Sequence, residues 1–460
     1  MAKHIITEHE FFDNIKSNSE FLNKCFDPNK MTFGYKVDVK GSDETKFFFY
    51  LDKKKISENG RVVGYKDCFR ASYLIGAQWV KIYNKMHKQD DKIEIKSLEK
   101  VIVLPKFKNI DYPKMFMLCL RSGLESEEFS KLYDISLSSA DESIDAPSLA
   151  SVLDPLLLSH FLFLVEKLIK NGLKKDYIYC SDNLKKPKGK INIRLNDIKN
   201  VITKRYDRVY CNYSIYSEDI PENRIIKKAL LFAKKMIQFD NGSGSLAGIL
   251  KKALNSFSGV SGDIQVSEIK QVKKNKLYRE YPETVRLAKM ILRRYGYSLS
   301  NVKKSAEVPA FWVDMAGLFE HYTLIKLKQK FKDEMVYQFD ENTKFKWRPD
   351  FLLKKGESNS PMILDSKYKL DLNKKLDADD EEEVIKQLSA YSRENQIINL
   401  IDAEKEETIP CVLIYPVEPD SEIGCGLDHV EFTKNGLSQY AIDGLSNFYA
   451  VPMGVPMLKN

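Results

Sequence analysis

Two short apolar runs with charged residues at their ends constrain the fold of this chain more than any other stretch. The runs are residues 351–353 and 362–364, and a polar segment rich in Lys, Gly, Ser and Asn, residues 354–360, separates them. Apolar runs of this kind, bounded by turn residues and by Pro361, are typical of the two strands of a β-hairpin. We therefore predict a hairpin with an apolar middle.

Charged side chains stand where the two predicted strands meet at one end. Asp350 precedes the first strand, while Asp365 and Lys367 end the second. Side chains alternate along a strand, so Asp365 and Lys367 share one face and Ser366 points to the other. Because the first strand starts where the second ends, we expect two carboxylates and one ammonium group to converge there.

This set of groups suits the hydrolysis of a phosphodiester. Carboxylate oxygens are hard ligands for Mg²⁺, which prefers few protein ligands together with waters and phosphate oxygens. A bound divalent ion lowers the pKa of its water, and a lysine can orient that water or stabilise the oxyanion. Asp350, Asp365 and Lys367 form the pattern Pro-Asp and Asp-x-Lys, which resembles that of the PD-(D/E)xK phosphodiesterases. The alternative is an ordinary hairpin with solvated charges, since short motifs also match by chance.

Two neighbouring segments have helical periodicity and carry polar groups that could join this site. In residues 381–399, Gln387 and Tyr391 lie four apart on one polar stripe, where they could contact DNA or a metal-bound water. The alternative is a stripe that faces solvent. In residues 313–330, Glu320 flanks an apolar face and could supply a third carboxylate, or it is an ordinary surface glutamate.

Composition describes a soluble globular chain with room for two or three domains. The 460 residues are 43% hydrophobic and 30% charged. The longest apolar stretch, residues 156–169, is too short and too charged to span a bilayer, and the N-terminus lacks the apolar core of a signal peptide. We expect a cytoplasmic protein without a membrane partner.

Cysteine, histidine and charge exclude some classes of function. The seven cysteines are dispersed without a CxxC pair, which argues against a disulfide framework and a zinc ribbon. The six histidines form no HExxH motif. A net charge of +8 is compatible with a polyanionic partner but does not require one.

Hydrophobic periodicity predicts an α+β multidomain protein in three parts. Residues 1–108 form a β-rich N-terminal domain without a catalytic group, which favours docking to a partner or binding of DNA over catalysis. Residues 109–300 form a mainly helical middle domain, and residues 301–460 form an α/β domain with a mixed sheet, which the PD-(D/E)xK resemblance of its hairpin would make the nuclease core. The predicted strands are 32–39, 46–51, 73–82, 93–104, 411–415 and 448–453, and the predicted helices of the middle domain are 112–120, 153–173, 225–237 and 270–294.

The middle domain contains a segment in which basic and aromatic residues alternate, between residues 185 and 216. Lysine and arginine can neutralise phosphates, and aromatic rings can stack on bases. We expect Lys204, Arg205 and Arg208 to contact nucleic acid, together with Arg348 beside the hairpin. The alternative for this segment is a solvated basic face beside a packed tyrosine cluster.

Nine short motifs follow one another over most of the chain. They are Tyr73-Leu-Ile-Gly76, Ile102-Val-Leu-Pro-Lys106, Gly189-Lys-Ile191, Cys211-Asn-Tyr213, Asp219-Ile-Pro-Glu-Asn-Arg224, Leu318-Phe-Glu320, Arg348-Pro-Asp350, Asp365-Ser-Lys367 and Gln387-Leu-Ser-Ala-Tyr391. In this order they resemble the McrC family, the nuclease subunit of McrBC-type modification-dependent restriction systems. Two details depart from the family: one extra residue stands before Pro105, and Lys386 replaces an aromatic residue.

The resemblance implies an endonuclease that cuts double-stranded DNA with Mg²⁺, for which Mn²⁺ could substitute. Its metal ligands would be Asp350 and Asp365, with Lys367 as the catalytic lysine. The supporting residues would be Gln387, Tyr391 and Glu320. The resemblance also implies a McrB-like AAA+ GTPase hexamer as a partner that this chain stimulates.

The chain contains no GxxxxGK[ST] motif, the P-loop that binds nucleotide phosphates. This agrees with a partner subunit that supplies the nucleotide-driven motor. Two alternatives stay open at this point. One is a non-catalytic regulator of an AAA+ ring, and the other is a stand-alone PD-(D/E)xK repair nuclease.

Overall fold

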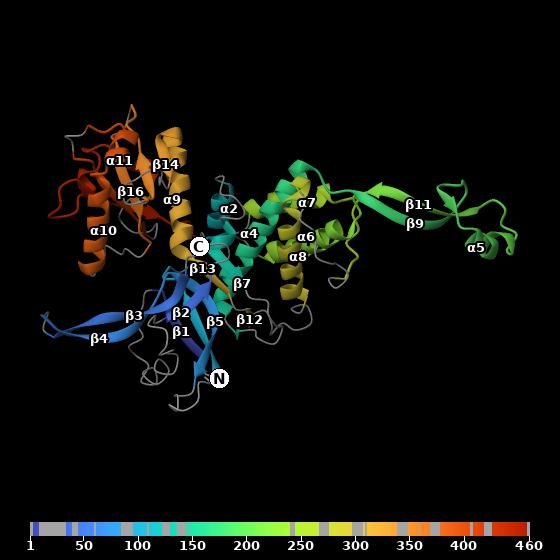
Figure 1. The fold of residues 1–460 in the computed structure, drawn as a ribbon, viewed down its shortest axis with the longest axis horizontal. Helices are drawn as coiled ribbons and strands as arrows, with labels where there is room; N and C mark the ends of the chain where they lie inside the picture. The colour runs from blue at the N-terminus through green and yellow to red at the C-terminus, as the bar shows by residue number, and fades with distance from the viewer. Residues whose placement is uncertain are drawn as a thin grey trace. The chain divides into compact units, whose positions relative to one another are not determined.

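The computed structural model describes most of the chain, in segments. They are residues 3–8, 34–38, 45–58, 61–83, 95–107, 110–121, 129–135, 144–145, 147–239, 244–265, 276–296, 307–308, 311–337, 348–357, 359–368, 378–404, 408–417 and 426–457. The chain forms two compact units, one made of Met1–Pro155 and Ala306–Asn460 and the other of Leu156–Ser305 (Figure 1). Helices and strands occur in both units, as expected for an α+β protein, while the three-part division remains a prediction.

The first unit contains a five-stranded sheet that joins strands from residues 3–135 to one strand at residues 311–314. Its order is β1 (Lys3–Thr7), β6 (Ile95–Leu104), β5 (Leu74–Tyr83), β13 (Phe311–Asp314) and β7 (Tyr133–Ile135). β1 is parallel to β6 and the other pairs are antiparallel. Gly76 has a φ of +146°, and a Cβ there would lie 2.2 Å from the carbonyl oxygen of Phe311. Only glycine fits at this close contact between β5 and β13, which gives the Tyr73–Gly76 motif a structural reason.

Smaller elements complete the β-structure of this unit. A three-stranded sheet contains β2 (Gly34–Asp38), β3 (Thr45–Glu58) and β4 (Arg61–Ala71), and β8 (Ile144–Asp145) pairs with β12 (Glu307–Val308). α2 (Tyr112–Arg121) is the helix expected at 112–120. The four strands predicted in residues 1–108 are confirmed as β2, β3, β5 and β6, whereas β1 and β4 were not predicted.

A second five-stranded sheet in this unit contains the hairpin. Its order is β14 (Met335–Tyr337), β15 (Phe351–Leu353), β16 (Met362–Ser366), β17 (Cys411–Val417) and β18 (Phe448–Gly454). β14, β15 and β16 are antiparallel, and β16, β17 and β18 are parallel. The predicted hairpin and mixed sheet are therefore confirmed. Every residue of β15 and β17 is buried, as in strands covered on both faces.

Two long helices contact the central strand β16 of this sheet. α9 (Met315–Phe331) buries the apolar face that the sequence predicts, including Leu318, Phe319 and Tyr322. α10 (Ala378–Tyr391) packs on the other side through Leu388 and Tyr391 (Figure 1). The continuous helix expected at 381–399 is wrong, because a turn after Tyr391 separates α10 from α11 (Asn395–Leu400).

The second unit combines a helical body with a β-ribbon. α4 (Pro147–Asn171) leads into it, and α6 (Pro221–Phe239) packs against α7 (Gly244–Ser256) and α8 (Tyr281–Gly296). From this body projects a ribbon of β9 (Asp176–Leu184), β10 (Lys190–Ile191) and β11 (Val209–Ser217), which ends in the short helices α5 (Ile193–Asn196) and η2 (Asp197–Val201) (Figure 1). The described part of the middle region is mainly helical, as expected, while its basic and aromatic segment forms a ribbon that was not predicted. None of the helices in the described part of the chain has the length and apolar character needed to cross a bilayer.

The base of the ribbon is tied to the helical body by the Asp219–Arg224 motif. Arg224 donates two hydrogen bonds to the carboxylate of Asp219, at 2.8 and 2.7 Å. The fully buried Asn223 donates to the carbonyl of Lys174 just before β9 and accepts from the hydroxyl of Tyr281 in α8. These contacts fix both strands of the ribbon where they leave the body.

Candidate active site at the end of the hairpin

The hairpin brings Asp350 beside the end of β16. Phe351 pairs with Leu364, so the residue before Phe351 lies next to the residues that follow Leu364. Asp350 Oδ2 accepts hydrogen bonds from the backbone N–H of Ser366 at 3.1 Å and from its hydroxyl at 3.3 Å. Asp350 is therefore fixed beside the peptide that joins Asp365 to Ser366.

Asp365 and Lys367 form an ion pair at the same place. The distance from Lys367 Nζ to Asp365 Oδ2 is 2.6 Å, and the Asp365 side chain is only 3% exposed. Burial raises the pKa of Asp365 to about 7; the charges of Asp350 and Glu320 add to the rise, and Lys367 opposes it. Burial disfavours the ammonium form of Lys367, but the charges of Asp365 and Asp350 outweigh it and raise the pKa of the lysine. Lys367 is thus a cation at neutral pH.

α10 contributes Tyr391 and Gln387 to the same region. Gln387 Nε2 donates a hydrogen bond to the Tyr391 hydroxyl at 2.6 Å. Tyr391 is buried, and its pKa is raised first by that burial and then by the charges of Asp365 and Asp350. Tyr391 therefore does not face solvent, whereas Gln387 is exposed beside it.

Glu320 of α9 is half-buried and also acts on the site. Its Oε1 accepts a hydrogen bond from the hydroxyl of Tyr337 in β14 at 3.1 Å. The charge of Glu320 contributes to the raised pKa of Asp365, so the Glu320 carboxylate is close enough to repel the ionised form of Asp365. Glu320 is therefore not the solvated surface glutamate of the alternative interpretation.

The donor groups fit a hard divalent cation that keeps most of its waters. Asp365 is a buried carboxyl whose ionised form is disfavoured by Asp350 and Glu320, and a cation relieves that repulsion. Within the described segments, no group of three or more His, Cys, Asp or Glu side chains is arranged as a ready metal cage. The candidate ligands are the two carboxylates of Asp350 and Asp365. Mg²⁺ typically accepts so few protein ligands, because waters and phosphate oxygens complete its shell.

The four cations expected to contact nucleic acid lie in both units. Arg348 is exposed, two residues before Asp350. Lys204 and Arg205 are exposed and Arg208 is half-buried; all three lie at the outer end of the ribbon in the second unit. The structure therefore groups Arg348, but not the other three, in the same compact unit as the carboxylates.

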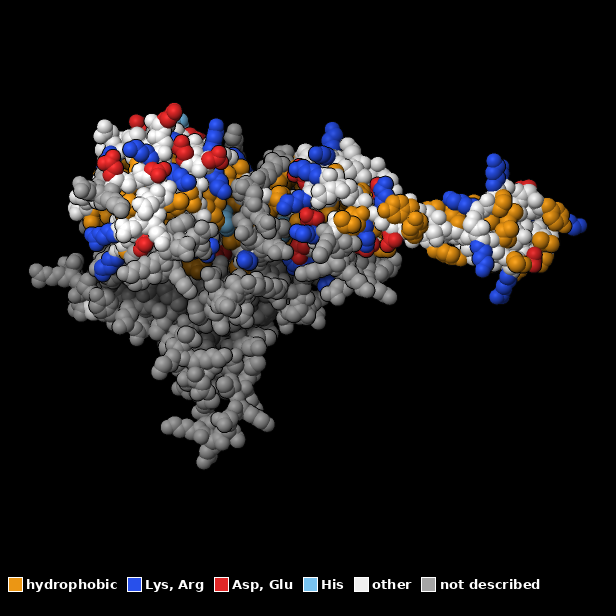
Figure 2. All heavy atoms as spheres, turned by 45° about the horizontal axis from the view of Figure 1, so that its top comes forward, with side chains coloured by type: hydrophobic (Ala, Val, Ile, Leu, Met, Phe, Trp, Pro, Cys, Tyr) orange, Lys and Arg blue, Asp and Glu red, His pale blue; other side chains and the backbone are white. Residues whose placement is uncertain are grey.

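The outer end of the ribbon also exposes apolar side chains that the sequence reasoning missed. We call this end, residues 191–206, the ribbon tip. Figure 2 shows apolar atoms and the Lys and Arg side chains interspersed over the ribbon. The exposed fractions are 72% for Ile193 and 74% for Ile202. The available signal was the run of isoleucines and valine between 191 and 202, interleaved with Asn, Asp and Lys.

The ribbon tip is nevertheless well ordered by hydrogen bonds. The amides of Asn183 and Asn200 donate to each other at 2.8 and 2.9 Å, and Asn200 also donates to Asn196. Gly189, with φ of +69°, brings β10 so close to β11 that a Cβ would lie 2.6 Å from the carbonyl oxygen of Asn212. The exposed isoleucines therefore lie on a backbone that these contacts hold in place.

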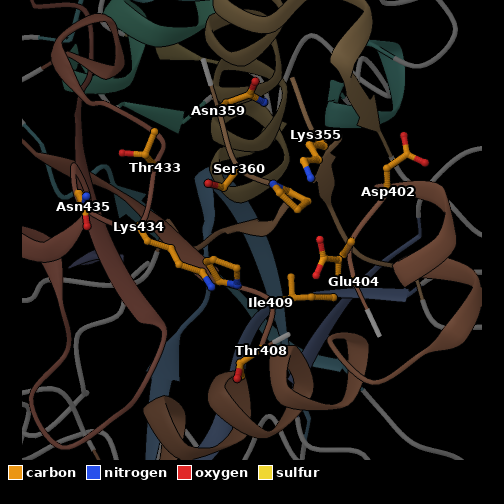
Figure 3. A pocket seen from close by; sticks show the side chains of 13 residues that line it. Lys355, Asn359, Ser360, Asp402, Glu404, Thr408, Ile409, Thr433, Lys434 and Asn435 are labelled. Atoms are coloured by element: carbon orange, nitrogen blue, oxygen red, sulfur yellow. The ribbon is translucent and has the colours of Figure 1, made fainter. Parts of the chain in front are cut away.

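A separate hollow of about 360 Å³ lies at the opposite end of the hairpin. Figure 3 shows Lys355 and Glu404 on one side of it and Thr433 and Lys434 on the other. Lys355 belongs to the turn between β15 and β16, whereas Asp350 and Asp365 lie at the other ends of these strands. This hollow is therefore distinct from the cluster of carboxylates.

Comparison with known proteins gives one family match. Residues 87–416 match the sequence profile of the family described as McrBC 5-methylcytosine restriction system component. None of the curated proteins matches the chain. Two solved structures from Thermococcus gammatolerans are similar to it. One is a half-complex from a tetradecameric assembly of McrB AAA+ hexamers with bound McrC, at 17% identity and a TM-score of 0.37, covering 99% of this chain and 95% of that one. The other is the cryo-EM structure of the McrBC complex, at 15% identity and a TM-score of 0.30, covering 71% of this chain and 87% of that one.

Proposed function

This chain belongs to the family of McrBC 5-methylcytosine restriction system components, and from that premise we propose that it is the nuclease subunit of such a system. It would cleave double-stranded DNA with Mg²⁺ through a PD-(D/E)xK site. The observation that supports this most strongly is the convergence of Asp350, Asp365 and Lys367 at one end of the hairpin. A degenerate nuclease would have lost one of these three groups.

In the proposed mechanism, Asp350 and Asp365 hold the metal and Lys367 acts on the phosphate. When bound, the metal ion supplies a water of lowered pKa and neutralises charge on the attacked phosphate. Lys367 keeps a positive charge beside Asp365, from which it can bind a phosphate oxygen or orient the attacking water. The Tyr391 hydroxyl, held by Gln387, is a hydrogen-bond donor near both carboxylates. Glu320 increases the negative potential that attracts the cation.

The second part of the proposed function is assembly with an AAA+ GTPase ring. The two Thermococcus gammatolerans structures are of McrB AAA+ hexamers with bound McrC and of the McrBC complex. This chain has no P-loop sequence, so a motor must come from a partner. We propose that it binds such a ring and stimulates its GTP hydrolysis.

The ribbon tip is the surface that we assign to this partner. Isolated apolar residues on a surface are ordinary, but several on one ordered platform are typical of a protein interaction site. Ile193, Ile198 and Ile202 are all exposed there. We assign only the apolar side chains of the tip to the ring: Lys204 and Arg205 within the tip and Arg208 just after it remain proposed DNA contacts, as does Arg348 near the carboxylates.

The direct test is plasmid cleavage by the purified chain, with and without an AAA+ GTPase encoded beside it, in the presence of Mg²⁺, Mn²⁺ or EDTA. We expect metal-dependent cleavage that requires the partner. Equal cleavage without a partner would favour a stand-alone nuclease. Partner GTPase stimulation without any cleavage would favour a non-catalytic regulator.

A further inference from the structure

A buried carboxyl group near the N-terminus connects the first sheet to the end of β16. Glu8 follows β1 and is 3% exposed. Its Oε1 accepts two hydrogen bonds, from the backbone N–H of Lys106 at 3.0 Å and from the hydroxyl of Tyr368 at 3.1 Å. Glu8 thus joins the residue after the Pro of the Ile102–Lys106 motif to the residue immediately after Lys367.

Lys106 holds the same tyrosine at a second point. Its Nζ donates a hydrogen bond to the backbone carbonyl of Tyr368. The same Nζ lies 4.3 Å from the centroid of the Tyr368 ring and 4.8 Å from that of Phe107, within the range of cation–π attraction. The Tyr368 ring also packs against Phe319 of α9, with 5.8 Å between ring centroids. Hydroxyl, ring and carbonyl of Tyr368 are therefore all fixed.

These contacts restrain the backbone on both sides of the Lys367 side chain. The N–H of Lys367 donates to the carbonyl of Ile414 in β17 at 2.9 Å, which fixes the residue on one side. On the other side, the carbonyl of Tyr368 is held by Lys106. A lysine has a long and flexible stem that already lets its ammonium move. A fixed Cα is therefore a precondition for a fixed ammonium.

We propose, on the premise of the function proposed above, that Glu8, Lys106 and Tyr368 form a clamp that positions Lys367 for phosphodiester hydrolysis. We call these three residues the Glu8 clamp. They are positioning residues, since they hold the backbone that carries Lys367 and supply no metal ligand. The clamp gives the Ile102–Lys106 motif a role in the reaction, although 262 residues separate Lys106 from Tyr368.

The decisive variant is Lys106→Met, which keeps an unbranched apolar stem and removes the ammonium. The matched control is Lys355→Met, the same change at an exposed position in the turn of the hairpin. Two further variants keep or remove single contacts: Tyr368→Phe removes the hydroxyl bonded to Glu8, and Lys106→Arg restores a cation with N–H donors.

The first measurement is hydrogen–deuterium exchange of peptides that cover residues 362–368 in the full-length chain. The second is single-turnover DNA cleavage with the AAA+ partner, with Mg²⁺ affinity measured separately by calorimetry. We expect faster exchange in Lys106→Met and a cleavage rate reduced about 10- to 100-fold, since a misplacement of about 1 Å can cost that much. Mg²⁺ affinity and DNA affinity should stay at wild-type values, Lys106→Arg should recover part of the rate, and Lys355→Met should behave as wild type.

Three outcomes would overturn the clamp as a positioning device. They are faster exchange with wild-type cleavage, unchanged exchange and cleavage, or a loss of cleavage that follows a loss of Mg²⁺ affinity. If Lys106→Met does not fold, the smaller change Tyr368→Phe decides by the same two measurements. Failure of the proposed function is seen separately, because the wild-type chain would then show no metal-dependent cleavage at all. In that case the clamp would have no role in catalysis. Faster exchange in Lys106→Met would then show only that the clamp stabilises the local structure.

Discussion

The Lys367 ammonium lies 2.6 Å from Oδ2 of Asp365, at the point where β16 ends. The carboxylate is almost completely buried, while the lysine side chain keeps 28% of its surface exposed. The ion pair thus consists of a buried carboxylate and a lysine that solvent can reach. In the function that we propose, Asp365 and Lys367, which neutralise each other here, exchange these partners for a metal ion and a phosphate.

Removal of the Asp365 carboxylate should separate catalysis from assembly. We predict that Asp365→Ala reduces DNA cleavage to background, because one of two metal ligands is lost. Partner binding and partner GTPase stimulation should be intact, since Asp365 is buried and the ribbon tip belongs to the other unit. Plasmid cleavage and GTPase assays on the same complex check this. Wild-type cleavage by the variant would make the site assignment wrong.

Metal binding should depend on pH through Asp365. Its pKa is raised to about 7 in the metal-free protein, so below that pH the carboxyl is mostly protonated and must lose a proton when a cation binds. We predict that Mg²⁺ affinity falls about tenfold for each pH unit below 7 and levels off above it. Calorimetry in buffers of different ionisation enthalpy measures the released proton. A flat affinity between pH 5.5 and 8 would contradict this.

Charge reversal in the basic part of the ribbon should weaken DNA association. Lys204→Glu with Arg205→Glu removes two exposed cations and adds two anions. We predict lower affinity at low salt and a salt slope that is less steep by about 0.9 for each phosphate that the variant no longer neutralises. Fluorescence anisotropy over a salt series checks it. Charge reversal at the exposed Lys355 is the control, and unchanged affinity in the double variant would remove this segment from the DNA path.

Polar substitution on the ribbon tip should weaken assembly with the AAA+ partner. Ile193→Ser and Ile202→Ser change side chains that are 72% and 74% exposed, so the folding stability of the chain should change by less than about 0.5 kcal/mol. We predict reduced co-elution with the ring and reduced GTPase stimulation. Leu277→Ser, at a position 79% exposed outside the ribbon, is the matched control. Equal losses in the control would contradict a specific surface.

The hairpin and its charged ends could be predicted because their signal is local. Apolar runs, turn residues and flanking charges all lie within about twenty positions, and the register follows from them. The Glu8 clamp could not be predicted, since 360 residues separate Glu8 from Tyr368 and only the folded sheet brings them together. The partners of Glu320 and Tyr391 depend in the same way on how two helices pack against β16.

The ribbon was missed for a different reason. Sequence patterns detect strands chiefly through the alternation that burial imposes. In β9, Tyr177 and Tyr179 are 72% and 65% exposed, so no core-facing pattern marks the strand. The turn after Tyr391 was missed because Ser392, Arg393 and Glu394 include neither Gly nor Pro, the usual signs of a helix end.

The strand β13 has a consequence for how this protein can be dissected. It lies between β5 and β7, and the chain passes from Asp314 directly into α9, whose first turn that residue caps through Gly317. A fragment starting at residue 301 would carry this strand away and leave β5 with an open edge in what remains. Excised halves should therefore be prone to aggregation, and biochemical work is best done by point substitution in the intact polypeptide.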